Sequence, residues 1–157
     1  MPDHYEIDNV DISILSVLQN NAKKPYTEVA KQAFVSSGTV HVRMNKLEKM
    51  GVVKGASLDL NLKALGYTVG SFLGIYLSQS SLYDKVAEQL KKIPEITSIL
   101  YTTGNYSMFV RIYAKDTDHL KNILHDKVQN VMGIERTETF VILEETLNRS
   151  ITLTEKS

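Results

Sequence analysis

Residues 37–46 carry hydroxyl, imidazole and basic side chains on one face of a predicted helix. Val40, Met44 and Leu47 recur at i, i+4 and i+7, so they would face a core and leave the other side chains exposed. Hydroxyl and imidazole groups can hydrogen-bond base edges or phosphates, an exposed valine can touch a thymine methyl, and basic groups suit phosphates or guanine. The candidate DNA-contacting residues are Ser37, Gly38, Thr39, His41, Val42, Arg43 and Lys46.

The same residues also have ordinary structural interpretations. Arg43 can pair with Glu48 or with another neighbouring carboxylate. A serine at a helix start, such as Ser36, is more often a cap than a DNA contact, and for Thr39 the two interpretations are balanced. Because a helix-turn-helix exposes this face of its third helix, DNA contact is favoured for His41 and for the basic members of the set.

A second polar group surrounds a glycine in the C-terminal half of the chain. A free amino acid has a carboxylate and an ammonium group, so its site needs N–H donors and also acceptors or an aromatic face. A turn at 102–106 can supply the donors, because Gly104 permits close approach of the backbone. A plain β-hairpin turn explains the same residues, and ordinary turn chemistry favours that explanation. The candidate residues are Thr102, Thr103, Gly104, Asn105 and Tyr106.

Other kinds of chemistry find little support in the sequence. There is no cysteine, and the four histidines lack a paired ligand spacing, so we expect no disulfide and no metal site. No nucleophile with a base, no recognisable pair of carboxylates and no phosphate-binding glycine loop are evident, so we expect neither enzymatic activity nor a cofactor. An enzyme built on a ferredoxin-like domain, and a scaffold whose N-terminal helices bind partners, are the alternatives. Exposed basic residues at 43 and 46 argue against the scaffold.

Composition indicates a folded protein without a strong overall charge. Eighteen Lys and Arg balance eighteen Asp and Glu, so any binding to DNA must come from a local patch. The most apolar stretch, 67–77, is far shorter than the roughly 20 residues of a membrane-spanning helix. The first residues are acidic and polar where a secretion signal would be basic and then apolar, so we expect a cytoplasmic protein with no membrane association.

The first 60 residues show helical periodicity. Asp8 and Asp11 can cap a first helix, with Ile7 and Ile12 as a hydrophobic staple, and Pro25 suits the first turn of a second helix. The buried faces of these two helices are expected at Ile12, Leu15, Leu18, Val29, Ala30 and Ala33.

A third helix and a β-rich segment complete the N-terminal pattern. Ser36 can cap this helix, Gly51 can end it, and the β-rich residues 52–60 follow. Three short helices with tight turns before such a segment predict a winged helix-turn-helix in residues 1–60. Residues 61–66 form a linker.

The pattern of residues 67–157 predicts an α+β domain. Strand-like segments at 67–77, 96–103, 106–114 and 134–143 alternate with two helical stripes. This order is the ferredoxin-like βαββαβ arrangement of RAM and ACT domains, with both helices on one face of an antiparallel sheet. Phe72 and Tyr76 share the other face with glycines, so we expect a second subunit to cover it. The helical stripes consist of Leu82, Val86, Leu90 and Ile93, and of Leu120, Ile123, Leu124, Val128 and Val131.

Several segments in one register resemble the Lrp/AsnC family of feast-or-famine regulators, and within it the AsnC type. The resemblance covers nearly the full length, with two domain signatures in the family's order joined at LGY. The segments are IDNVDISIL (7–15), NAKKPYTEVAK (21–31), VSSGTVHVRMNKLEKMGVVKGA (35–56), LGY (65–67), TTGNYSMFVRI (102–112) and ERTETFVIL (135–143).

The resemblance implies a transcriptional regulator that binds double-stranded DNA as a homodimer, usually assembled into octamers. A small amino acid bound between C-terminal domains tunes such regulators, and the AsnC type points to asparagine. By the same resemblance, Tyr101 and Gln129 would line the effector site, where a glutamine can pair with a side-chain amide in both directions. The chain departs from many members at Asn105 and Ser107, where they carry aspartates.

Overall fold

The computed structural model describes residues 5–155, which form two compact units. One unit consists of residues up to Asp59 together with the tail from Leu147, and the other runs from Leu60 to Thr146. The division after Asp59 puts residues 61–66, predicted as a linker, in the second unit, and the tail from Leu147 in the first. Residues 1–4 and 156–157, at which the two predicted domains begin and end, lie outside the described residues.

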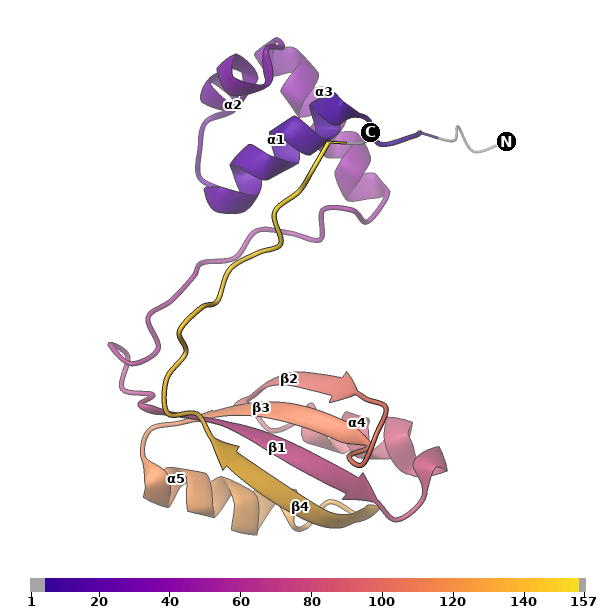
Figure 1. Ribbon diagram of the computed structural model, residues 1–157, viewed down its shortest axis with the longest axis vertical. Helices are drawn as coiled ribbons and strands as arrows, with labels where there is room; N and C mark the ends of the chain where they lie inside the picture. The colour runs from indigo at the N-terminus through magenta and orange to yellow at the C-terminus, as the bar shows by residue number, and fades with distance from the viewer. Residues whose placement is uncertain (1–4, 156–157) are drawn as a thin grey trace. The chain divides into compact units, whose positions relative to one another are not determined.

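Three helices form the first unit (Figure 1). They are α1 (Asn9–Asn20), α2 (Tyr26–Ala33) and α3 (Ser37–Lys49). The side chain of Asp8 accepts a hydrogen bond from the Asp11 N–H and that of Asp11 accepts from the Asp8 N–H, which is the capping box expected from the sequence. Ser36 caps α3 by accepting from the Thr39 N–H at 3.1 Å.

The core of this unit contains one buried side-chain face from each helix. The buried positions predicted for α2 and α3 are confirmed, including Val29 and Val40. For α1 the prediction was partly wrong: Ile14 and Leu18 are buried, whereas Ile12 and Leu15 are only partly buried. The buried face of α1 contains residues 11, 14 and 18. Because residue 11 is an aspartate, the spacing of apolar residues alone did not indicate this face.

The segment after α3 differs from the sequence prediction. Gly51 has a φ of 73°, as expected for a residue that ends a helix. Residues 52–60 were predicted to be β-rich, but the structure has no strand in this segment. The N–H groups of Val52 and Val53 instead donate to the carbonyl of Leu47 on the last turn of α3. Val53 packs against the helical core, so its hydrophobic character reflects this contact and not a strand.

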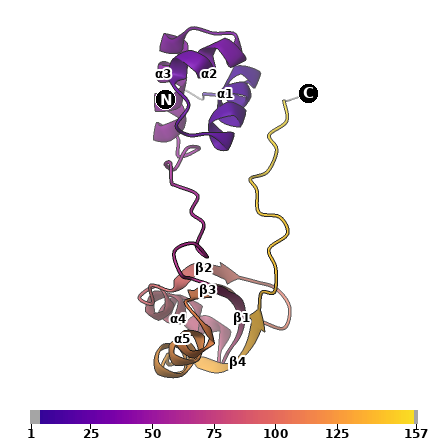
Figure 2. The same cartoon turned by 90° about the vertical axis from the view of Figure 1, so that its left-hand side faces the viewer.

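The second unit is a four-stranded antiparallel sheet with helices on one side (Figure 2). Its strands are β1 (Val69–Leu77), β2 (Ile96–Tyr101), β3 (Met108–Ala114) and β4 (Ile134–Val141), in the order β2-β3-β1-β4. The helices are η1 (Ser80–Leu82), α4 (Tyr83–Leu90), α5 (Thr117–Asn122) and the π-helical η2 (Ile123–Val128). This confirms the ferredoxin-like βαββαβ order.

The two faces of the sheet differ in chemistry. Leu73, Ile75, Val110 and Ile112 point toward the helices and are fully buried. The helices do not cover the opposite face of the sheet, as Figure 2 shows. Aromatic side chains lie on this face. The rings of Phe109 and Phe140 lie 6.5 Å apart on it, and the ring of Tyr106 lies within 6.0 Å of each.

Candidate DNA-binding and effector-binding sites

The helix α3 positions the predicted DNA-contacting residues. Its buried side is fixed in the core of the first unit, so the opposite side faces outward. Gly38, His41, Val42 and Lys46 are exposed, while Thr39 is half-buried. Ser37 is half-buried as well. The structure thus places these six predicted residues on one helix, five of them in its N-terminal half and Lys46 nearer its C-terminal end.

Arg43 differs from the other six residues because carboxylates hold its side chain. Its side chain is 23% exposed, and its Nη1 donates to Asp8 at 2.7 Å and to Asp11 at 3.0 Å. The same nitrogen lies 3.2 Å from the Tyr5 hydroxyl. A carboxylate partner was among the interpretations of Arg43, but a partner more than 30 positions away could not be identified from local spacing.

The carboxylates around Arg43 form a compact ionic cluster. The side chain of Asp11 is fully buried and accepts from the Tyr5 hydroxyl, the Asp8 N–H and Arg43. Hydrogen bonds from Arg43 and from the Asp11 N–H hold the pKa of Asp8 below its usual range. Hydrogen bonding to Asp8, together with Asp11, raises the pKa of Arg43 although burial opposes this. Arg43 therefore ties α3 to the beginning of α1.

Two exposed residues of α3 contact aromatic rings on neighbouring segments. The Nζ of Lys46 lies 4.8 Å from the centroid of the Tyr5 ring. The His41 ring meets Tyr26 edge-on, with centroids 4.5 Å apart. These contacts orient both side chains while leaving each exposed to a ligand. With Arg43 neutralised by its carboxylates, the local positive charge depends on lysines such as Lys46.

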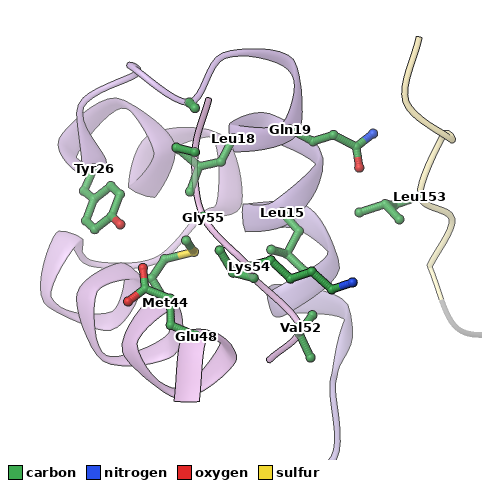
Figure 3. A pocket seen from close by; sticks show the side chains of 13 residues that line it. Leu15, Leu18, Gln19, Tyr26, Met44, Glu48, Val52, Lys54, Gly55 and Leu153 are labelled. Carbon is green, nitrogen blue, oxygen red and sulfur yellow. The ribbon is translucent and has the colours of Figure 1, made fainter. Parts of the chain in front are cut away.

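A cavity of about 440 Å³ opens on another part of the first unit. Leu15, Leu18 and Met44 line it, and the segment after α3 contributes Val52 (Figure 3). Leu153 of the tail faces this apolar wall from across the opening, as Figure 3 shows. The tail is also held by a hydrogen bond of 2.6 Å from Gln19 Nε2 to the carbonyl of Ile151. The C-terminal tail is therefore part of the surroundings of the DNA-binding unit.

The predicted effector turn joins β2 to β3. The Thr102 N–H donates to the Ser107 carbonyl at 3.2 Å, and the Thr102 hydroxyl donates to the Tyr106 carbonyl at 2.8 Å. Gly104 has a φ of 99°, which few other residues adopt, and a side chain added there would meet open space. Thr103 and Asn105 are exposed beside it. The turn is internally braced and leaves its tip accessible.

Aromatic residues flank this turn on both sides. Tyr101 is 62% exposed and its ring lies 4.4 Å from that of Tyr83 on α4. The ring of Tyr106 lies directly over Gly74, where an added Cβ would come within 2.5 Å of it. Tyr83 and Gly74 were not among the predicted site residues, because the strand pairing and the helix position that bring them here are not visible in local spacing.

A glutamate links two tyrosines on the open face of the sheet. Glu138 accepts from the Tyr106 hydroxyl at 2.6 Å and from the Tyr76 hydroxyl at 3.2 Å. The hydrogen bond to Glu138 raises the pKa of Tyr106 to about 12, and the hydrogen bond from Tyr106 lowers the pKa of Glu138. The guanidinium of Arg136 lies 3.8 Å from the centre of the Tyr76 ring. This cluster presents hydrogen-bonding and charged groups next to the turn.

Gln129 lies elsewhere on the second unit. It is exposed at the end of η2, where its N–H donates to the Leu124 carbonyl, and its side chain has no hydrogen-bond partner among the described residues. A second cavity, of about 520 Å³, has Tyr113 and His119 in its wall. Neither this cavity nor the first one is lined by residues 101–106 or by Gln129. The assignment of these residues to an effector site therefore stays a prediction.

Residues 5–155 contain neither a candidate metal site nor a helix that could span a membrane. No group of three or more His, Asp or Glu side chains is placed to hold a metal ion there. Over the same part of the chain, every helix is too short or too polar to cross a membrane.

The first unit is a helix-turn-helix with an exposed third helix, and the second is a ferredoxin-like sheet unit. This combination is typical of a transcriptional regulator with a separate ligand-binding domain. Comparison with known protein families supports both parts. Residues 7–54 match the winged helix-turn-helix DNA-binding domain, and residues 71–151 match the Lrp/AsnC ligand binding domain. The chain belongs to the Lrp/AsnC family, and it is an AsnC-like transcriptional regulator with a DNA-binding and an amino-acid-binding domain.

Individual relatives agree with this assignment. The chain is 40% identical to the regulatory protein AsnC of Escherichia coli K12, over 95% of this chain and 98% of that protein. The solved structure of E. coli AsnC superposes with a TM-score of 0.88 and covers 94% of this chain and 99% of that one. A transcriptional regulator of Neisseria meningitidis, solved in complex with L-Met, has a TM-score of 0.88 at 21% identity, covering 95% of this chain and 97% of its own, and so shows the shared fold.

Proposed function

We propose that this regulator binds double-stranded operator DNA through α3, and that asparagine bound in the second unit modulates the binding. The DNA-binding part of this proposal rests on the outer side of α3. His41 and Lys46 are exposed there, while the other side of the helix is packed in the core. Base edges would be contacted from the N-terminal half of this helix, and phosphates from Lys46. The proposed contact residues are Ser37, Gly38, Thr39, His41, Val42 and Lys46.

Titration of DNA binding against salt tests this assignment. The logarithm of the affinity falls with the logarithm of salt concentration by about 0.9 for each phosphate neutralised. Lys46→Ala should reduce that slope by about one for each DNA-binding head engaged. Lys91→Ala is a matched control, because Lys91 lies in the second unit and pairs with Glu88. A slope unchanged by Lys46→Ala would contradict the proposed contact.

The proposal of asparagine draws on the likeness to E. coli AsnC and on the chemistry of the predicted residues. Exposed N–H groups at the tip of the turn suit a carboxylate, and the ring of Tyr101 offers a face for an ammonium group. The free side-chain amide of Gln129 can donate to and accept from the amide of asparagine. Neither of the two cavities described above is lined by Gln129 or by the turn, and we propose that the site is completed between subunits.

Calorimetry with the natural amino acids tests the effector. Asparagine should release or absorb heat on mixing, and Gln129→Ala should weaken asparagine more than it weakens alanine, which has no side-chain amide. Gln32→Ala is the control, because this exposed glutamine lies on α2 in the other unit. If asparagine gave no heat while another amino acid did, the family would stand and the proposed effector would be replaced.

We further propose a homodimer that assembles into octamers, joined through the open aromatic face of the sheet. Half-buried and exposed rings on this face, among them Phe109 and Phe140, form the kind of apolar surface that subunits cover. Light scattering with Phe140→Lys should show smaller particles than the unmodified chain. Regulation by DNA binding needs no catalytic activity, cofactor or membrane, and we propose that the protein works in the cytoplasm without them.

A further inference from the structure

Phe34 has a backbone conformation that does not suit its side chain. It ends α2 with φ 55° and ψ 42°, in the left-handed region, and donates its N–H to the Ala30 carbonyl. Among the described residues it alone, apart from glycines, has a positive φ. Bulky side chains rarely adopt this conformation, whereas glycine and asparagine accept it readily. The turn requires only a backbone here, and a phenyl ring makes it less stable.

Packing does not explain the ring either. Its side chain is 94% exposed, which makes it one of the two most exposed large hydrophobic side chains described. The next residue, Val35, is partly buried and packs against the helical core. Phe34 thus combines backbone strain with an apolar surface in water, and strained residues of this kind cluster at functional sites.

The position of Phe34 indicates what the ring contacts. It lies in the turn between α2 and α3 and precedes Ser36, the cap of α3, by two residues. Two residues span at most about 7 Å, so Phe34 lies within that reach of the helix end proposed to face the base edges. Its neighbours Gln32 and Ser36 are polar and exposed. A lone ring among polar side chains lacks the contiguous apolar area of a subunit interface.

We propose that Phe34 is a DNA-contacting residue, whose ring lies against a deoxyribose or a thymine methyl at the edge of the groove entered by α3. This inference rests on the proposed function. The contact would be apolar and would neutralise no phosphate, so its contribution to affinity would not depend on salt concentration. Such behaviour differs from that expected of Lys46 on α3, whose contribution should fall as salt concentration rises.

The experiment measures DNA affinity and thermal unfolding for the full chain and its variants. The probe is a duplex recovered from a random-sequence pool by selection with the unmodified chain. Phe34→Gly and Phe34→Asn should weaken binding about tenfold, as expected when roughly half of a phenylalanine surface loses its partner. The factor should be equal at all salt concentrations. Both variants should unfold at the same or a higher temperature, because each fits the left-handed backbone, and Phe34→Tyr should keep near-normal affinity.

The outcomes separate this inference from the proposed function. If the unmodified chain selects no duplex, the proposed DNA binding fails and the role of Phe34 fails with it. If the unmodified chain binds and both variants bind equally well, only the role of Phe34 is overturned. A change in particle size by light scattering, with DNA affinity unchanged, would also overturn it and would identify Phe34 as a subunit contact.

Discussion

Replacing Arg43 with methionine tests whether this residue positions α3 or contacts DNA. Methionine keeps the length of the side chain but removes the guanidinium that binds Asp8 and Asp11. The pair with Asp8 is half-exposed and contributes no more than about 0.5 kcal/mol. The pair with Asp11 involves a fully buried carboxylate, and removing one partner of such a pair costs about 3–5 kcal/mol.

Two features reduce that cost. The Arg43 side chain is 23% exposed, so water partly replaces it, and Asp11 keeps its hydrogen bonds from Tyr5 and from the Asp8 N–H. We therefore expect Arg43→Met to destabilise the first unit by about 2–3 kcal/mol. In a unit of this size, each kcal/mol lowers the unfolding temperature by about 4–8 °C. Calorimetry or circular dichroism would record a decrease of roughly 10–20 °C.

Acid unfolding provides an independent signature of the same cluster. Because the pKa of folded Asp8 is below its ordinary value, Asp8 contributes stability that is present above the ordinary value and is lost as pH falls through the folded pKa. Arg43→Met should remove most of this contribution, so its stability should change less below about pH 4 than that of the unmodified chain. Titration of the Asp8 carboxyl by NMR would follow the change directly.

Lys31→Met is the matched control for stability. Lys31 pairs with Glu28 in the same unit, but both side chains are largely exposed, at 73% and 51%. The expected change is within about 0.5 kcal/mol. If Arg43→Met left the unfolding temperature unchanged and lowered the salt slope of DNA binding, Arg43 would be a phosphate contact and the positioning role would be refuted.

Three other substitutions test the remaining parts of the structure. Gly74→Ala should displace the ring of Tyr106, because the new Cβ would lie 2.5 Å from it. The near-ultraviolet circular dichroism spectrum should change, and an unchanged spectrum would show that the ring does not lie over Gly74. Tyr106 should ionise near pH 12 in an ultraviolet titration, and Glu138→Gln should move this step toward 10. The stabilising effect of its raised pKa is complete below about pH 10 and is lost as pH approaches 12, so an unmoved step would exclude the hydrogen bond. Leu153→Asp should destabilise the first unit by about 1 kcal/mol, because it removes an apolar contact of the tail. Ile151 is largely exposed, so Ile151→Asp should not destabilise it. Equal unfolding temperatures for the two variants would show that the tail does not pack on this cavity.

Local signals in the sequence predicted the elements of the fold well. Capping by Asp8 and Ser36 depends on residues three positions apart, and alternation in β3 depends on residues two positions apart. Such short separations are readable without knowing the fold. The order of strands and helices along the chain was enough to indicate the ferredoxin-like fold.

Contacts between distant residues could not be predicted in the same way. Arg43 has a helical spacing that suits an outward position, but carboxylates at positions 8 and 11 draw it back to α1. Pairing of Gly74 with Glu138 in the β1 and β4 register brings Tyr76 and Glu138 together, and no local pattern marks that register. The same limit applies to the tail, whose contact with Gln19 joins residues 132 positions apart.

The Arg43 cluster also bears on how this regulator would hold DNA. Two carboxylates neutralise the arginine, so the outer side of α3 depends on Lys46 and its neighbouring lysines for attraction to phosphates. The chain as a whole has no net charge to add to this attraction. Since each neutralised phosphate contributes a similar increment to affinity, one such head binds weakly at physiological salt, and two or more joined heads multiply the effect. On the proposed function, an effector that changes the assembly or the spacing of heads would therefore control DNA occupancy without touching α3.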